Sequence, residues 1–136
     1  MKGFIPHVIE NTETEALYHL AAKDNKTYYI GQALTLDTGK VTPDVSGAVP
    51  KYLCRTAVEI ESGASGVVAC TPLRADIIYE TEVGENALSS SAAGTAVGVD
   101  SDGMTITDAS GYSDVFEIVE AAGTTEKSKA LVRLLK

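Results

Sequence analysis

The residue types that carry most enzyme and metal chemistry are few in this chain. It has two histidines, His7 and His19, and no set of cysteine or carboxylate ligands completes a zinc site at either one. The Gly-x-Ser-x-Gly pattern of a nucleophilic serine has no match, and Gly63-Ala64-Ser65-Gly66 falls one residue short of it. We therefore predict no catalytic residue, no metal site and no cofactor, and we expect that the chain is not an enzyme.

Two groups of carboxylates need a separate explanation. Asp100-Ser101-Asp102-Gly103 begins like a calcium-binding loop, but Gly111 occupies the place of the closing glutamate. Turn formation explains this string without a metal. Glu80 and Glu82 alternate along a β-rich run, which is typical of a solvated strand face rather than of a catalytic acid and base.

The two cysteines, Cys54 and Cys70, are too few for the disulfide framework of a secreted protein. If residues 62–66 form a hairpin turn, Cys70 lies opposite a residue near Val58, and Cys54 lies about four residues further along. At ~3.4 Å per residue this offset is roughly 13 Å, which is beyond the reach of a disulfide. We predict two free, buried cysteines that act as small hydrophobic residues.

The elements that must position these residues are predicted to be β-strands. Turn-forming residues recur at short intervals with apolar runs between them, which favours an all-β, barrel-like or sandwich-like domain with short hairpins and at most one or two short helices. Residues 52–60 alternate with period two, as a half-buried strand does. Further strands are predicted over residues 66–71, 77–81, 115–120 and 129–135. Residues 97–106 are predicted to form a hairpin whose two strands are joined by a tight Asp-Gly turn.

Four segments are less regular. Residues 12–23 and 126–135 fit either a strand or a short helix, and residues 85–94 are small and polar like an exposed loop. Residues 1–11 show no periodicity, and we expect an N-terminal arm outside the core. The predicted organisation is therefore an arm over 1–11 and a single β-rich domain over 12–136.

Composition narrows the choice of partner. The chain has 136 residues, 44% of them hydrophobic, and a net charge of −8. This charge argues against binding to nucleic acid or to an anionic membrane, because both need a basic surface. No apolar run reaches the ~20 residues of a membrane span, and the first residues lack the apolar core of a signal peptide. We expect a protein made in a reducing cytoplasm.

Several stretches are similar to a known family. They are residues 29–36, 39–42, 49–53 and 73–81 (YIGQALTL, GKVT, VPKYL and LRADIIYET), and later residues 98–99, 102–107 and 115–120 (GV, DGMTIT and VFEIVE) with Gly123 and the basic closing strand. In strand-and-turn order and in a few dipeptides, the chain over residues 15–136 resembles the capsid decoration (head-stabilising) proteins of tailed bacteriophages.

The resemblance implies a β-rich protein on the outside of the virion, assembled in the bacterial host cytoplasm. Such a protein binds the expanded head as a homo-oligomer, often a trimer, and clamps neighbouring subunits of the major capsid protein. The arm would then contact the capsid by adding a strand to a sheet edge or by filling a groove. Two alternatives for the arm are a disordered tail and a strand in the chain's own sheet. The candidate capsid-contact residues are Phe4, Ile5, Pro6, Val8 and Ile9.

A module that binds carbohydrate or a host surface is the main alternative function. Such sites commonly use exposed aromatic side chains. This chain has no Trp, and its six Tyr and two Phe residues fall mostly at core-like strand positions. A cluster of exposed tyrosines would favour this alternative, whereas a deep pocket lined by His19 and two carboxylates would favour an enzyme.

Overall fold

The computed structural model describes residues 3–9, 17–45 and 49–135, and within these ranges the chain is all-β, as predicted. The pattern of the 6-residue strand Ile77–Glu82 shows why, since its side chains alternate between buried and half-buried positions. The strands that the structure describes are β1 (Ile5–Ile9), β2 (Tyr18–Ala21), β3 (Lys26–Tyr28), β4 (Ala33–Asp37), β5 (Lys40–Thr42), β6 (Tyr52–Cys54), β7 (Val58–Ile60), β8 (Val67–Pro72), β9 (Ile77–Glu82), β10 (Ala96–Val99), β11 (Ile106–Thr107), β12 (Phe116–Ala121) and β13 (Lys129–Leu134).

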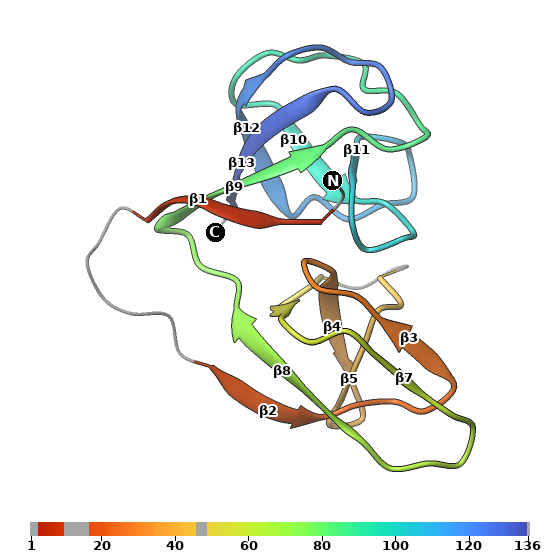
Figure 1. The fold of residues 1–136 in the computed structure, drawn as a ribbon. Coiled ribbons are helices and arrows are strands. Elements are labelled where there is room, and N and C mark those ends of the chain that lie inside the picture. Colours follow the sequence, from red (N-terminus) through yellow and green to blue (C-terminus); the bar gives the residue numbers. More distant parts are fainter. Residues whose placement is uncertain (1–2, 10–16, 46–48, 136) are drawn as a thin grey trace.

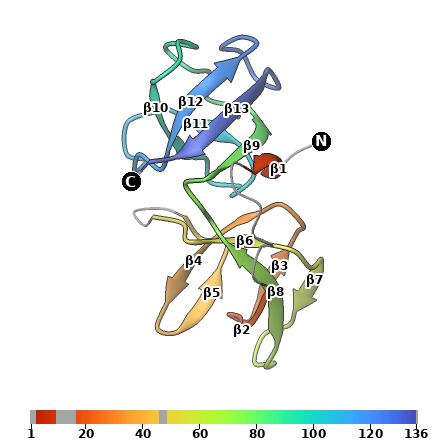
Figure 2. The ribbon, with the colours of Figure 1, turned by 90° about the vertical axis from the view of Figure 1, so that its left-hand side faces the viewer.

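The strands form two lobes (Figures 1 and 2). The upper lobe is a 6-stranded sheet in the order β1-β9-β13-β12-β10-β11, and the lower lobe combines a 5-stranded sheet, β2-β8-β6-β4-β5, with the pair β3-β7. The upper sheet curls, because Val83 just after β9 forms a parallel bridge with Ile106 in β11. Strand β8 leads directly from the lower lobe into β9 (Figure 1).

Two hydrophobic clusters form the core. The larger one fills the curled sheet, where Phe116 packs against Phe4 and Tyr79 with ring centroids 5.0 and 6.1 Å apart. It also includes Ala33 and Leu53 from the lower sheet, so the two lobes share buried contacts. The smaller cluster lies within the lower lobe and contains Tyr28, Leu34, Val68 and both cysteines, among others.

The N-terminal segment differs from the arm predicted outside the core. Phe4 is 1% exposed and belongs to the larger core cluster. Strand β1 pairs antiparallel with β9, with a bulge between Pro6 and Val8. The alternative of a strand in the chain's own sheet therefore describes residues 5–9. Residues 1–2 and 10–11 lie outside the described ranges.

The predicted strand over residues 52–60 is also corrected. It is two strands, β6 and β7, which belong to different sheets. Between them the Thr56 hydroxyl accepts a hydrogen bond from the Ala69 N–H (3.3 Å), and β7 then pairs with β3 instead of β8. The expected register is therefore wrong, because β8 pairs with β6 and places Cys70 opposite Cys54. Both cysteines are free and buried, as predicted.

Other local predictions are confirmed. Strands β10 and β11 form an antiparallel pair, although their loop spans residues 100–105 rather than a two-residue turn. Strands β12 and β13 form the predicted closing pair, which makes the C-terminal segment a strand. Residues 85–94 form a loop without strands, and residues 18–21 form β2, whereas residues 12–16 lie outside the described ranges.

Candidate binding surface

Where the structure describes their side chains, the residues considered first for chemistry form no metal-ligating group. His19 is exposed on β2. Among the residues that the structure describes, no group of three or more His, Cys, Asp or Glu side chains is placed to hold a metal ion. The Asp102 carboxylate accepts hydrogen bonds from the N–H groups of Met104 (2.8 Å) and Thr105 (3.2 Å), so it closes a turn.

A tight turn over residues 29–32, between β3 and β4, combines exposed apolar side chains with several backbone hydrogen bonds. The Gln32 N–H donates to the Tyr29 carbonyl (3.2 Å), and the Gln32 side-chain oxygen accepts from the Tyr29 N–H (3.2 Å). Gly31 has a φ of +90°, which suits the third position of a type II turn. Ile30 therefore occupies the second position, at the outer corner.

Three other parts of the chain hold this turn in place. The Phe4 N–H donates to the Gly31 carbonyl (2.7 Å), and the Gly31 N–H donates to the Cys54 carbonyl (2.9 Å). The Gln32 amide donates to the Asp102 carbonyl (3.2 Å). These partners come from the residue before β1, the end of β6 and the 100–105 loop, so the turn lies at the boundary of the two lobes (Figure 1).

A close backbone approach explains why glycine stands at this position. A Cβ atom added to Gly31 would lie 3.2 Å from the Cα atom of Gly3. Any side chain there would push the β1 segment away from the turn, in addition to the strain of a positive φ. The two glycines thus let the N-terminal strand and the turn touch.

The turn presents apolar side chains to solvent. Ile30 is 61% exposed and Tyr29 is 51% exposed. Beside them lies a groove of about 160 Å³ that is lined by Phe4, Ile5, Pro6, Ile30, Gly31, Leu53 and Arg55. We call Ile5, Pro6, Tyr29 and Ile30 the Ile30 surface. A rigid, exposed apolar side chain next to an apolar groove is suited to binding another protein.

The structure separates the candidate capsid-contact residues. Phe4 packs on Phe116 and has 1% of its surface left for a partner, whereas Ile5 and Pro6 are half-buried and line the groove. Val8 and Ile9 pair with Ile78 and Ile77 through the strand backbone.

Sequence reasoning missed Tyr29 and Ile30. The signal that could have found them is Gly31, which interrupts an otherwise β-rich run at the point where a turn requires a positive φ.

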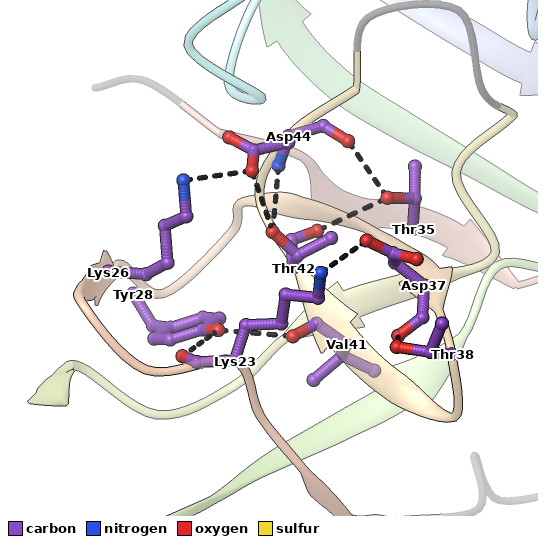
Figure 3. A network of polar contacts seen from close by, with 9 residues as sticks. All are labelled: Lys23, Lys26, Tyr28, Thr35, Asp37, Thr38, Val41, Thr42 and Asp44. Carbon is purple, nitrogen blue, oxygen red and sulfur yellow. Dashed lines mark hydrogen bonds and ion pairs between the residues drawn. The ribbon is translucent and has the colours of Figure 1, made fainter. Parts of the chain in front are cut away.

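A polar network joins β3 to the β4–β5 hairpin within the lower lobe (Figure 3). The buried Tyr28 hydroxyl lies 2.8 Å from the Lys23 carbonyl and 3.0 Å from the Val41 carbonyl, and burial raises the pKa of Tyr28 to about 12. Lys26 forms an ion pair with Asp44 (2.8 Å), which lowers the pKa of the Asp44 carboxyl. A second ion pair joins Lys23 to Asp37. These contacts tie the β4–β5 hairpin to β3.

No helix in the described part of the chain has the length and apolar character needed to cross a membrane. No protein-family model matches the chain, and no curated protein matches it significantly in sequence.

Proposed function

We propose that this chain is a structural virion protein that binds the outer surface of an expanded bacteriophage head and stabilises contacts between subunits of the major capsid protein. The observation that carries this proposal is the Ile30 surface, an exposed apolar corner that backbone hydrogen bonds hold from both lobes. The resemblance to decoration proteins suggests the major capsid protein as the partner, and the Ile30 surface is the region that we propose binds it.

Rigidity favours such a role. A side chain on an already fixed turn loses little conformational freedom on binding, so more of its burial contributes to affinity. Each copy needs only modest affinity, because many copies on a repeating lattice together stabilise the shell that they bind. The net charge of −8 limits random self-association before assembly.

The state of β1 favours contact through side chains over strand addition. Among the described strands, β1 pairs with β9 alone and so forms an edge of its sheet. Pro6 removes a backbone donor from this edge, and the bulge between Pro6 and Val8 interrupts its regular spacing. Both features discourage pairing with another strand. With strand addition disfavoured, the capsid would contact β1 through the side chains that line the groove beside Ile5 and Pro6.

Co-sedimentation with expanded, undecorated heads tests the proposal, with unexpanded heads as the control. We expect saturable binding to expanded heads and at least a tenfold loss of affinity in Ile30→Asp. The matched control is Val67→Asp, since Val67 is a similarly exposed (59%) β-branched residue in the lower lobe. We expect Val67→Asp to bind like the unmodified chain.

Each result has a distinct meaning. An absence of binding to either form of the head would reject the decoration role, and a glycan screen would then test the carbohydrate-binding alternative. Binding that Ile30→Asp leaves unchanged would keep the role but reject the Ile30 surface. Sedimentation equilibrium of the free protein tests the homo-oligomer, for which we propose a trimer.

A further inference from the structure

The two cysteines lie directly opposite each other on neighbouring strands. Cys54 in β6 is the register partner of Cys70 in β8. The backbone groups of Cys54 point to the other side of its strand, since its N–H donates to the Gln32 carbonyl (2.8 Å) and its carbonyl accepts from the Gly31 N–H (2.9 Å). The next residue, Arg55, donates its N–H to Ala69 (2.8 Å). Cys54 and Cys70 are therefore a non-hydrogen-bonded pair.

This type of pair brings two side chains closest together in an antiparallel sheet. Its Cα atoms are about 4.5 Å apart, and both Cβ atoms project from the same face. A disulfide requires Cα atoms roughly 4.4–6.8 Å apart, so this position meets the condition without a shift of the strands. Both side chains belong to the same core cluster, which agrees with a shared face.

We propose that Cys54 and Cys70 are a modification site at which a small-molecule disulfide, such as oxidised glutathione, converts the two thiols into an intrachain disulfide. The thiolate of one cysteine attacks the oxidant, forms a mixed disulfide and releases one glutathione thiol. The thiolate of the other cysteine then attacks the protein sulfur of the mixed disulfide and releases the second glutathione. Two protein S–H bonds are lost, and the S–S bond of the oxidant is reduced to two thiols.

Burial controls when this reaction occurs. Both cysteines are 0% exposed, and burial raises the pKa of Cys70 to about 11, with the neighbouring Cys54 as a further cause. The Cys54 Sγ also contacts the Thr56 carbonyl (3.1 Å). The folded thiols are thus protonated and shielded from an oxidant. We expect the disulfide to form while the chain folds, or when β6 and β8 separate transiently, and to form slowly in the native protein.

The disulfide would stabilise the lower lobe. It closes a ring over residues 55–69, which contains β7 and the turn that follows it. A loop of this length, closed without native strain, raises the unfolding temperature of a domain of this size by about 10 °C. This inference does not depend on the proposed capsid role, since it follows from the register of β6 and β8.

The test is refolding of the full chain from denaturant in a buffer of reduced and oxidised glutathione, followed by intact mass and non-reducing peptide mapping. We expect the mass to fall by two hydrogen atoms, one peptide to contain Cys54 linked to Cys70, and a reductant to lower the unfolding temperature by about 10 °C. The controls Cys54→Ala and Cys70→Ala should show no such difference between oxidising and reducing buffers.

Several results would overturn the proposal. Glutathione adducts or linked dimers without the intrachain bond would mean that the two thiols do not meet. An intrachain disulfide that lowers the unfolding temperature, or leaves it unchanged, would mean that the bond does not fit the native register.

Discussion

Replacing Phe4 with alanine tests whether the N-terminal segment belongs to the folded core. The Phe4 ring is 1% exposed and stacks on Phe116 with centroids 5.0 Å apart, whereas its backbone hydrogen bond to Gly31 does not need the ring. The substitution therefore removes a buried aromatic side chain and leaves a cavity. Changes of this kind cost about 3–5 kcal/mol, which is a large part of the roughly 5–15 kcal/mol that holds a domain folded.

Equilibrium unfolding in urea, followed by circular dichroism, measures this cost. With a denaturant dependence of about 2 kcal/mol per molar, the midpoint of Phe4→Ala should fall by about 2 M. Ile30→Ala is the control, because Ile30 is a large apolar residue that is 61% exposed and should change stability by less than about 0.5 kcal/mol. A loss below about 1 kcal/mol for Phe4→Ala would refute the reasoning, because residues 3–9 would then not be docked on the curled sheet.

Three further changes probe the turn and the polar network. Gly31→Ala should lower the urea midpoint more than Gly94→Ala, because both glycines have a positive φ (+90° and +89°) but only Gly31 meets another backbone within 4 Å; equal losses would contradict the close approach. Tyr28→Phe should cost about 1 kcal/mol at pH 7. Burial raises the pKa of Tyr28 from 10.0 to about 12, so the hydroxyl form stabilises the fold below pH 10. The stability advantage of the unmodified chain over Tyr28→Phe should therefore disappear as the pH rises from 10 to 12. A difference in urea midpoint between the two proteins that stays constant over this range would refute the prediction. Asp44→Asn should cost less than about 0.5 kcal/mol at pH 7, since Asp44 is 62% exposed. The pKa of Asp44 is lowered chiefly by the hydrogen bond from Lys26, so the ionised Asp44 carboxylate stabilises the fold above about pH 4. This stabilisation should vanish as the pH falls through the lowered pKa, which urea unfolding at a series of acid pH values would measure. A stability loss in Asp44→Asn that persists in acid would mean that the ion pair is not its cause.

The strand pairings that were predicted correctly from sequence are those between strands that lie near each other in the chain, β10 with β11 and β12 with β13. The residues of β12 and β13 carry their own alternation and are joined by a short connection, so local pattern is enough to pair them. Strand β1 has its partner β9 about 70 residues away, and nothing in its own short apolar run reveals that partner. Nonlocal pairing is thus the reason why Phe4 was expected outside the core.

The same limit applies to the strand expected over residues 52–60 and to the binding surface. Alternation runs unbroken through Arg55 to Ala57, yet the chain changes sheets there because the Thr56 side chain replaces a regular ladder partner of Ala69. Ile5 and Pro6 were singled out from the sequence as candidate contact residues, and both line the groove beside Ile30. Ile30 was not, since its exposure depends on a turn whose anchors come from three distant segments.

The pairing of β1 with β9 has a consequence for how the protein is made. Strands β2 to β8 follow one another without a strand from the upper lobe, so the ribosome completes the lower lobe first. Strand β1 leaves the ribosome before all of them, yet its partner is synthesised only after residue 76. At translation rates of about 5–20 residues per second, the apolar N-terminus waits several seconds for its place. The groove beside Ile30 is lined in part by Ile5 and Pro6, so nascent chains lack the completed surface at least until β9 has been synthesised.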